Sequence, residues 1–235
     1  MQMSNYTGPD PNRIRSMFAS ISTRYDRANT VLSGGVHHLW RTKAVRWSQA
    51  KEGDRVLDCA TGTGDLAIAF RKAVGASGRV VGTDFVPEML SVAREKAPDI
   101  TFEVADVTRL PYDDASFDVA FTISVLHHVP PAERSRFMAE MLRTIRPRGA
   151  AIIIEHNPLN PITRRIVSRC AFDADAVLLG SRETAKLLAD GGAPALGRRY
   201  LGFWPFRNAF IERAERAITW LPMGAQYCMW GIKSA

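Results

Sequence analysis

Short apolar runs alternate with helically spaced apolar residues through the middle of the chain. Each short run predicts a buried strand, and apolar residues three and four apart predict a helix. The expected strands span residues 55–60, 78–85, 100–107, 117–126 and 150–157, and the expected helices span 65–74, 87–97 and 132–145. Residues 147–149, Pro-Arg-Gly, are expected to form the turn that ends the third helix. Strand and helix alternating about every 25 residues predict a doubly wound parallel sheet.

The two flanks of this alternating region have a different pattern. The expected N-terminal elements are a helix at 11–29, with Ile14, Met17, Phe18 and Ile21 on one face, and a second amphipathic helix at 36–50. After residue 157 the alternation stops, and 158–180 carries no expected helix or strand. The expected C-terminal elements are a helix at 181–192 with Ser181 as its N-cap, a strand at 198–205, an amphipathic helix at 206–221 and a closing strand at 225–233.

Composition is ordinary for a soluble globular protein, and the length suits one α/β domain or a domain with an extra lobe. The chain has 235 residues, of which 46% are hydrophobic and 23% charged, and this length is sufficient to bury a large core. Cys59, Cys170 and Cys228 lie far apart and form no CxxC pair, so we expect neither a disulfide framework nor a thiolate zinc site, and a reducing cytoplasm fits. No apolar signal-peptide segment begins the chain, and no apolar run approaches the ~18 residues of a membrane-spanning helix.

Charge is unevenly distributed along the chain. The net charge is +7, yet residues 51–130 contain 8 basic and 13 acidic residues, so both flanks are basic. This pattern fits solvated surface charge or a basic face for an anionic substrate or for anionic lipid headgroups. A nucleic-acid partner is not expected, because there is no lysine-rich arm and the arginines are interleaved with glutamates.

The first chemistry-bearing motif is VLDCATGTGDLA at residues 56–67, between an expected strand and an expected helix. Glycines here allow tight turns and close ligand approach. A dinucleotide fingerprint would need a third glycine, but Leu66 stands two positions after Gly64. Asp58 and Asp65 are poor neighbours for a pyrophosphate and good neighbours for an ammonium and a sulfonium. The loop therefore favours S-adenosylmethionine over a nicotinamide dinucleotide.

Two further acids end the next two strands. Asp84 ends the second strand, where a carboxylate can accept both hydroxyls of a ribose. Asp106 ends the third, where it can accept from an adenine amino group while the backbone amide of Val107 faces a ring nitrogen. Ligands of such sheets bind at the carboxyl ends of the strands. The three acids together predict an adenosine site at that edge.

With these motifs the chain resembles the class I S-adenosylmethionine-dependent methyltransferases over residues 51–157. The segments LPYDDASFDVA (110–120) and MLRTIRPRG (141–149) also have the form of that family. The resemblance implies a Rossmann-like α/β fold with a seven-stranded, mainly parallel sheet, helices on both faces and an antiparallel last strand. It also implies three parts of one domain: a helical lid at 1–50, a cofactor-binding core at 51–157, and a C-terminal part at 158–235 with a substrate-side insertion.

A closer resemblance covers residues 13–120. The segment RIRSMFASISTRYDRANTVLSGGVHHLWR (13–41) and the motif DCATGTGDLA, with alanine at the first glycine position, are similar to the C-methyltransferases of menaquinone and ubiquinone biosynthesis. This resemblance implies cofactor contacts from Thr63, Asp84, Asp106 and Val107, and places Tyr25 near the methionine end. The full expected cofactor set is Tyr25, Asp58, Ala60, Gly62, Thr63, Gly64, Asp84, Phe85, Asp106, Val107 and Ser124.

The resemblance changes after the fourth strand. Where that subfamily has Gly-Ile-Arg-Asn, this chain has Val125-Leu126-His127-His128, and Glu155-His156-Asn157 follows the fifth strand. Residues 158–223 look more like methyltransferases of other small molecules. The acceptor is therefore either a prenylated quinol methylated on carbon or another small metabolite methylated on oxygen or nitrogen. A cofactor-binding regulatory domain without catalysis is the alternative from a different class.

His127 and His128 lie on the edge that would face the transferred methyl group, and Glu155 lies on the same edge. A histidine oriented by a carboxylate suits proton removal from a hydroxyl, since its pKa is near neutrality. The alternative is a scaffold role through hydrogen bonds to backbone. No metal is expected, because adjacent side chains diverge and no further ligand lies at ligand spacing. His37 and His38 are expected to be surface or packing residues.

Aromatic residues in the flanks allow two interpretations. Core packing is one, and the other is an apolar acceptor pocket under a lid formed by the N-terminal helices and the segment 158–223. The helix at 206–221 could also lie on a membrane surface, although its two glutamates weaken this. We therefore expect an S-adenosylmethionine-dependent methyltransferase of a small, apolar or aromatic acceptor, cytoplasmic or peripheral at the inner membrane surface.

Overall fold

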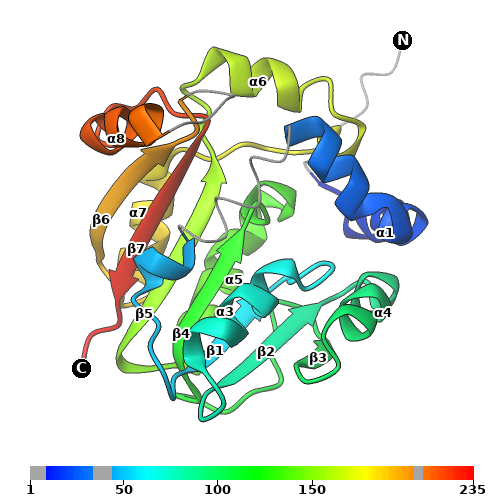
Figure 1. Ribbon diagram of the computed structural model, residues 1–235, viewed down its shortest axis with the longest axis vertical. Coiled ribbons are helices and arrows are strands. Elements are labelled where there is room, and N and C mark those ends of the chain that lie inside the picture. The colour runs from blue at the N-terminus through cyan, green and yellow to red at the C-terminus, as the bar shows by residue number, and fades with distance from the viewer. Residues whose placement is uncertain (1–8, 34–43, 204–208) are drawn as a thin grey trace.

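A single seven-stranded sheet forms the centre of the computed structural model, which describes residues 9–33, 44–203 and 209–235 (Figure 1). The strand order is β3-β2-β1-β4-β5-β7-β6. The strands are β1 (Arg55–Cys59), β2 (Arg79–Asp84), β3 (Thr101–Val104), β4 (Phe117–Ile123), β5 (Ile145–His156), β6 (Ala195–Leu201) and β7 (Gln226–Ile232). Strands β1 to β5 pair in parallel, whereas β7 is antiparallel to both β5 and β6. The expected sheet and its antiparallel last strand are confirmed.

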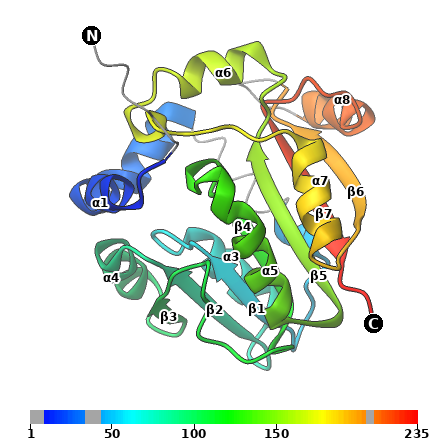
Figure 2. The same ribbon diagram turned by 180° about the vertical axis from the view of Figure 1, so that it is seen from behind.

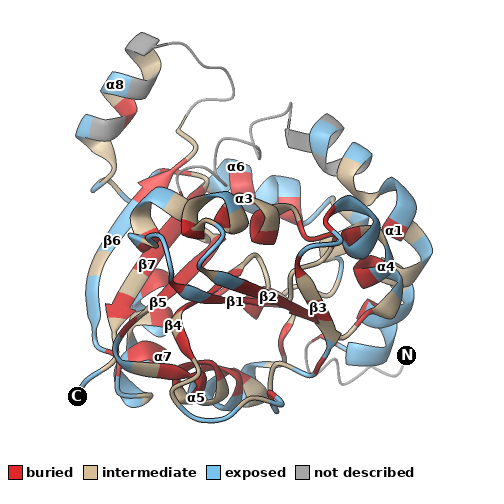
Figure 3. Ribbon diagram, turned by 60° about the horizontal axis from the view of Figure 1, so that its bottom comes forward, coloured by how far each residue is buried: buried red, intermediate tan, exposed pale blue. Residues whose placement is uncertain are grey.

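Helices cover both faces of the sheet (Figure 3). Helices α3 (Asp65–Val74) and α4 (Pro87–Lys96) pack on one face, and α5 (Arg134–Thr144) and α7 (Ser181–Asp190) pack on the other. The apolar runs of the central strands are buried on both sides, as parallel strands between two helical layers must be. The stacked rings of Phe70 and Phe121, with centroids 4.2 Å apart, join α3 to β4.

The carboxyl ends of the parallel strands point to one edge, and several elements lie beyond that edge (Figures 1 and 2). These elements are α1 (Pro11–Ser33), α6 (Pro161–Val167) and the short 3₁₀ helices η1 (Leu126–His128), η2 (Pro131–Glu133) and η3 (Ala171–Asp173). The pairing of β1 with β2 and β4 fixes which loops meet there, because neighbouring parallel strands end side by side. Loops that are far apart in the sequence are therefore brought to one edge.

Several expectations about local structure are wrong. Strand β4 ends at Ile123 rather than 126, because residues 126–128 form η1, and β6 begins at Ala195 rather than 198. Residues 147–149 do not form a turn but belong to β5, which begins at Ile145 because Ile145 pairs with Phe117 before a register shift. Strand β3 ends at Val104 rather than 107. The N-cap of α7 is Gly180, and the hydroxyl of Ser181 instead contacts that of Tyr200 at 3.1 Å. The segment 158–180 contains α6, which Asn160 caps through bonds from two backbone amides.

Several expected elements lie partly outside the described residues. Helix α8 (Ala209–Ile218) lies within the expected helix at 206–221. Residues 44–48 are helical, and the rest of the helix expected at 36–50, with His37 and His38, falls outside the described residues except for 49 and 50. None of the helices in the described ranges combines the length and apolar content that a membrane crossing requires.

Candidate functional site

The loop after β1 is built from residues in the left-handed backbone region. Ala60, Gly62 and Gly64 have φ angles of 59°, 58° and 78°. A Cβ atom on Gly64 would lie 2.9 Å from Ala93 and Phe102, so this glycine allows α3 to start close against its neighbours. Ala60 adopts the same backbone region with a side chain, which is strained for a non-glycine residue. The motif at 56–67 therefore forms a tight loop whose conformation depends on these left-handed backbone positions.

Asp84 and Asp58 anchor this loop from the ends of β2 and β1. Asp84 Oδ2 accepts from the Gly62 amide and Oδ1 accepts from the Val86 amide, both at 2.9 Å. Asp58 Oδ2 accepts from the Thr61 hydroxyl at 2.6 Å. Both carboxyls are buried, and burial raises the pKa of Asp58 to about 7 and that of Asp84 to about 6. Because the pKa values of both carboxyls lie near neutral pH, a ligand with positive charge would favour their ionised forms, which can also accept from its hydroxyl groups.

Four more predicted cofactor residues lie at the same edge. Asp106, after β3, is exposed, and its Oδ1 accepts from the amide and hydroxyl of Thr108 at 2.8 Å each. Val107, next to Asp106, and Phe85, directly after β2, are half-buried. Ser124 follows β4 with a φ of 54°, and its hydroxyl accepts from Gln226 Nε2 at 3.3 Å.

Helix α1 contacts the cofactor loop through Asp26, which the sequence analysis missed, as it missed the partner Lys96 on α4. The Thr63 hydroxyl donates to Asp26 Oδ1 at 2.5 Å, and Lys96 Nζ forms ion pairs with Asp26, at 2.8 Å, and with Asp65. Tyr25, predicted near the methionine end, lies on the same helix with its ring edge-on to Phe18 at 5.7 Å. In the sequence, the helical spacing of apolar residues in 11–29 indicates which face of this helix is buried, but it does not indicate which residues that face contacts.

The donor set at this edge fits S-adenosylmethionine. Acceptor carboxylates at the ends of β1, β2 and β3 match an ammonium, a ribose diol and an adenine amino group, and the buried Asp84 has lone pairs left on both oxygens. The loop also lacks the third glycine of a pyrophosphate-binding fingerprint, because Leu66 stands in that region. The residues present therefore fit this cofactor better than a dinucleotide.

A buried histidine–carboxylate cluster lies on the next strands along the edge. Glu155, at the end of β5, is fully buried, and its Oε1 accepts from the amides of Val125 and Leu126 at 2.8 and 2.6 Å. His127 Nδ1 lies 2.6 Å from Glu155 Oε2. The predicted pairing of a histidine with Glu155 is present in the structure, and it holds the ring of His127 in a fixed orientation.

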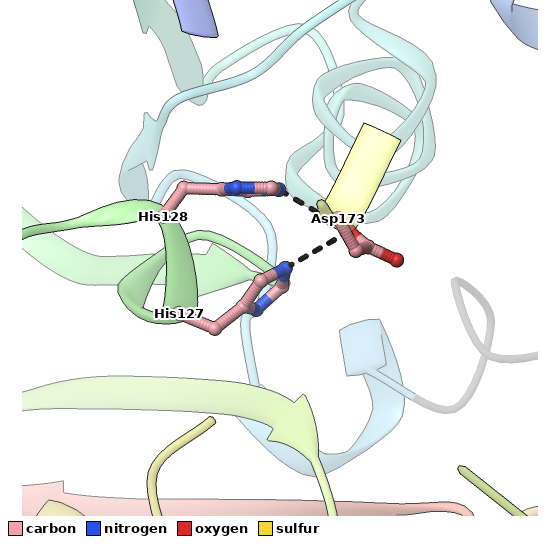
Figure 4. Close-up of side chains that lie close together, drawn as sticks. All are labelled: His127, His128 and Asp173. Carbon is pink, nitrogen blue, oxygen red and sulfur yellow. Dashed lines mark ion pairs between the residues drawn. The ribbon is translucent and has the colours of Figure 1, made fainter. Parts of the chain in front are cut away.

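Asp173 completes this cluster from a distant segment (Figure 4). Its Oδ1 lies 3.6 Å from His127 Nε2 and 3.4 Å from His128 Nε2. The two imidazoles therefore converge, with ring centroids 4.2 Å apart, so the argument that adjacent side chains diverge and lack a third ligand is wrong. The reason is that η1 winds tightly and that η3 brings a carboxylate from 45 positions away.

Charges within the cluster separate the pKa values of its members. Burial lowers the pKa of His127, but the charges of Glu155 and Asp173 outweigh burial and raise it to about 9. Burial lowers the pKa of His128, and lowers that of His156, whose ring lies 4.9 Å from that of His127, to about 4. Burial opposes ionisation of Glu155 and Asp173, yet contacts with His127 hold both pKa values below their usual range.

The fold and the strand-end carboxylates of this chain are those of the class I S-adenosylmethionine-dependent methyltransferases. The model of the ubiE/COQ5 methyltransferase family matches residues 7–173. The chain belongs to this family, and S-adenosylmethionine is the cofactor that membership implies. The match extends beyond 13–120 and includes both histidines and Asp173. The non-catalytic alternative is not supported, because the family is one of methyltransferases.

Individual proteins agree with this assignment. The chain is similar to a ubiquinone/menaquinone biosynthesis C-methyltransferase of Bdellovibrio bacteriovorus, with 50% identity over 67% of this chain and 67% of that one. It is 39% identical to a 2-phytyl-1,4-naphtoquinone methyltransferase of Nostoc punctiforme, over 65% of this chain and 69% of that one. The matches span about two thirds of these relatives. A methyltransferase structure from Thermotoga maritima shares the fold, with a TM-score of 0.72, 17% identity, and coverage of 94% and 100%.

Proposed function

We propose that this protein transfers a methyl group from S-adenosylmethionine to a ring carbon of a quinone precursor. The observation that carries the proposal is the 50% identity to a ubiquinone/menaquinone biosynthesis C-methyltransferase. A second relative at 39% identity acts on a phytyl-naphthoquinone, an acceptor of the same chemical class. Nothing in the described residues favours oxygen or nitrogen methylation over this reaction.

The strand-end residues would hold the cofactor in this reaction. Asp84 binds the ribose hydroxyls, Asp58 faces the ammonium end, and Asp106 with the Val107 amide reads the adenine. The bound cofactor supplies an activated methyl group on a sulfonium. Helix α1 would act as a lid over this edge, since Asp26 holds the cofactor loop through Thr63. Excluding water in this way protects the sulfonium and strengthens each charged contact.

The histidine cluster would act on the acceptor side. Loss of a proton from a hydroxyl of the quinol raises electron density at the adjacent ring carbon, which then attacks the methyl group. The carbon–carbon bond forms as the carbon–sulfur bond breaks, and the ring hydrogen leaves as a proton. His127, His128 and Glu155 are the residues proposed to manage these protons, because both histidines follow β4 in η1 and Glu155 at the end of β5 contacts His127.

A methyl-transfer assay tests the reaction. Protein and methyl-labelled S-adenosylmethionine are mixed with reduced demethylmenaquinone, and the product is analysed by nuclear magnetic resonance. We expect a new carbon-bound methyl group on the quinone ring. A methyl ether, or transfer only to a panel of phenols and amines without quinone character, would overturn the proposal.

Replacing His127 by Ala separates a catalytic role from a scaffold role. If His127 manages the acceptor's protons, its loss should lower turnover by about 10²–10⁴-fold with little change in cofactor affinity. Turnover comes from the labelled-methyl assay, and affinity comes from calorimetry. An equal loss of turnover and of cofactor affinity would show that His127 only supports the edge.

We also propose that the acceptor is reached at a membrane surface through α6. Leu159, Ile162 and Ile166 are 67%, 68% and 61% exposed on or beside this short helix. Met223, 66% exposed, is held next to them because Asn160 Nδ2 donates to its carbonyl at 2.6 Å. The exposed basic residues Arg164, Arg165 and Arg169 lie on the same segment. Apolar side chains interleaved with arginines suit insertion among anionic headgroups.

Vesicle co-sedimentation tests this contact. The double variant Ile162→Asp, Ile166→Asp should bind vesicles of phosphatidylglycerol and phosphatidylcholine at least about tenfold more weakly than the native chain, because two exposed apolar groups that would insert among the headgroups become charges. Leu196→Asp is the matched control, since Leu196 is similarly exposed, at 65%, but lies on β6 rather than on α6. Equal binding by all three proteins would contradict the proposal.

A further inference from the structure

We infer that His127, His128 and Asp173 form a binding site for a divalent transition-metal ion of the Zn²⁺ type. One ligand atom from each residue lies within 4.8 Å of the other two. Two imidazole nitrogens and one carboxylate oxygen are the donor set of many three-ligand metal sites, which leave a further position open. The cluster is largely enclosed, because His127 is buried and the side chains of His128 and Asp173 are 12% and 15% exposed.

Distances favour an ion over direct contact. A hydrogen-bonded histidine–carboxylate pair has its atoms about 2.7–2.9 Å apart. Asp173 Oδ1 instead stands 3.6 and 3.4 Å from the two Nε2 atoms. The edge of a tetrahedron is about 1.6 times its bond length, so bonds of about 2.0–2.1 Å place ligand atoms about 3.3–3.4 Å apart. The observed separations are close to those of two ligands that share one ion.

The hydrogen bonds of Glu155 prepare His127 for this role. Glu155 accepts from the amides of Val125 and Leu126 through Oε1, and from the His156 amide through Oε2 at 3.3 Å. It is therefore an acceptor, and Nδ1 of His127 carries the hydrogen of their 2.6 Å contact. Nε2 faces Asp173, and an ion that binds there would displace the proton that this nitrogen holds, as metal binding to histidine does. A carboxylate that fixes the tautomer in this way is a recurring outer partner of metal-bound histidine.

Backbone contacts hold the third ligand in place. The Val177 amide donates to the His127 carbonyl at 2.9 Å, and Arg134, buried beneath, donates to the carbonyls of Leu126 and Val177. Asp173 itself ends the turn of η3, where its amide donates to Cys170 at 3.1 Å. The segment that carries Asp173 is thus tied to the helix that carries both histidines. Ligands held by such contacts are already arranged before an ion arrives.

The ion would change how the cluster serves the acceptor, and this part of the inference rests on the proposed function. A cation beside an acceptor hydroxyl lowers the pKa of that hydroxyl, so its proton can leave to water without a free histidine base. His127 and His128 would then act through the ion, with Glu155 as a positioning residue. Metal binding itself does not depend on the identity of the acceptor.

Metal binding is tested on the tag-free full chain, in the absence of cofactor and acceptor. After dialysis against chelator, the protein is titrated with Zn²⁺ in competition with a chromophoric chelator, and with Co²⁺ for the intense visible absorption of a tetrahedral site. We expect one equivalent to bind and the thermal midpoint to rise. The variant Asp173→Asn should bind at least about tenfold more weakly and lose the Co²⁺ spectrum.

Asp175→Asn is the matched control, because Asp175 lies two positions from Asp173 and pairs with Arg13 at 3.0 Å. This variant should bind the ion as the native chain does. Equal affinity in both variants, or no stoichiometric binding by the native chain, would overturn the inference. Metal binding without methyl transfer to a quinol would overturn the proposed function and leave the metal site standing.

Discussion

Replacing Asp58 by Asn would measure how much free energy of unfolding the protein loses by keeping a buried carboxylate at the end of β1. Asp58 is 3% exposed, and burial raises its pKa from 3.8 to about 7. Unfolding returns the carboxyl to water and to its ordinary pKa. Between pH 4 and pH 7 the folded chain therefore holds a proton that the unfolded chain has released. In that window the free energy of unfolding falls as the pH rises.

The size of the effect follows from these two pKa values. Each pH unit inside the window costs about 1.4 kcal/mol, so at pH 8 the native chain has lost about 4 kcal/mol through this group. Asn carries no charge and can still accept from the Thr61 hydroxyl, which lies 2.6 Å from Asp58. Its amide hydrogens need new partners, at a cost of about 1–3 kcal/mol. We expect Asp58→Asn to raise the free energy of unfolding by about 1–3 kcal/mol at pH 8 and to change it little at pH 5.

Urea unfolding of both proteins at pH 5, 6, 7 and 8 gives this comparison directly. The control is Asp118→Asn. Burial opposes ionisation of Asp118, but Arg146 and Arg55 outweigh it and lower the pKa, so this variant should be less stable across the whole range. Cofactor affinity of Asp58→Asn should fall, because the ammonium loses its counter-charge. Parallel stability curves for Asp58→Asn and the native chain between pH 5 and pH 8 would refute the reasoning.

Three further variants test the cofactor edge. Asp84→Ala should weaken cofactor binding by at least about 100-fold in calorimetry, because charged hydrogen bonds to the ribose are lost; unchanged affinity would refute the site. Ala60→Gly should raise the free energy of unfolding by up to about 1 kcal/mol, since the φ of 59° suits glycine and the more flexible unfolded chain offsets part of the gain; a loss of stability would argue against strain. Thr63→Val should cost about 1–2 kcal/mol and speed hydrogen exchange in α1, because the bond to Asp26 is lost; unaltered exchange would show that the helix is held elsewhere.

Much of the cofactor edge could be predicted from the sequence, because it follows from strand order. Asp58 and Asp84 lie at the ends of β1 and β2, and Asp106 lies two positions beyond β3. Such parallel strands end at one edge whatever the helices between them contain. Helix α3 was predicted with its observed bounds, because the glycines before it and Gly75 directly after it bound a clear helical repeat. Local pattern and global topology coincide in this part of the chain.

The acceptor side could not be predicted in the same way. Nothing in the sequence near His127 indicates a contact with Asp173, because that contact depends on the path of a segment without periodicity. One available signal was missed, since Asn160 followed by Pro161 is a typical helix start and marks α6. Asp26 and Phe18 were placed on the right helix, but only the packing of α1 across the edge shows which side chains they contact.

Helix α1 contacts both halves of the edge. Asp26 binds the cofactor loop through Thr63, and Phe18 packs edge-on against His128 with ring centroids 5.6 Å apart. These two residues are eight positions apart, so they lie about two turns from each other along one rigid helix. A displacement of α1 that breaks one contact strains the other. Exchange of the spent cofactor and departure of the methylated product would therefore depend on the same movement of α1. A variant that loosens this helix would accelerate both steps rather than one of them.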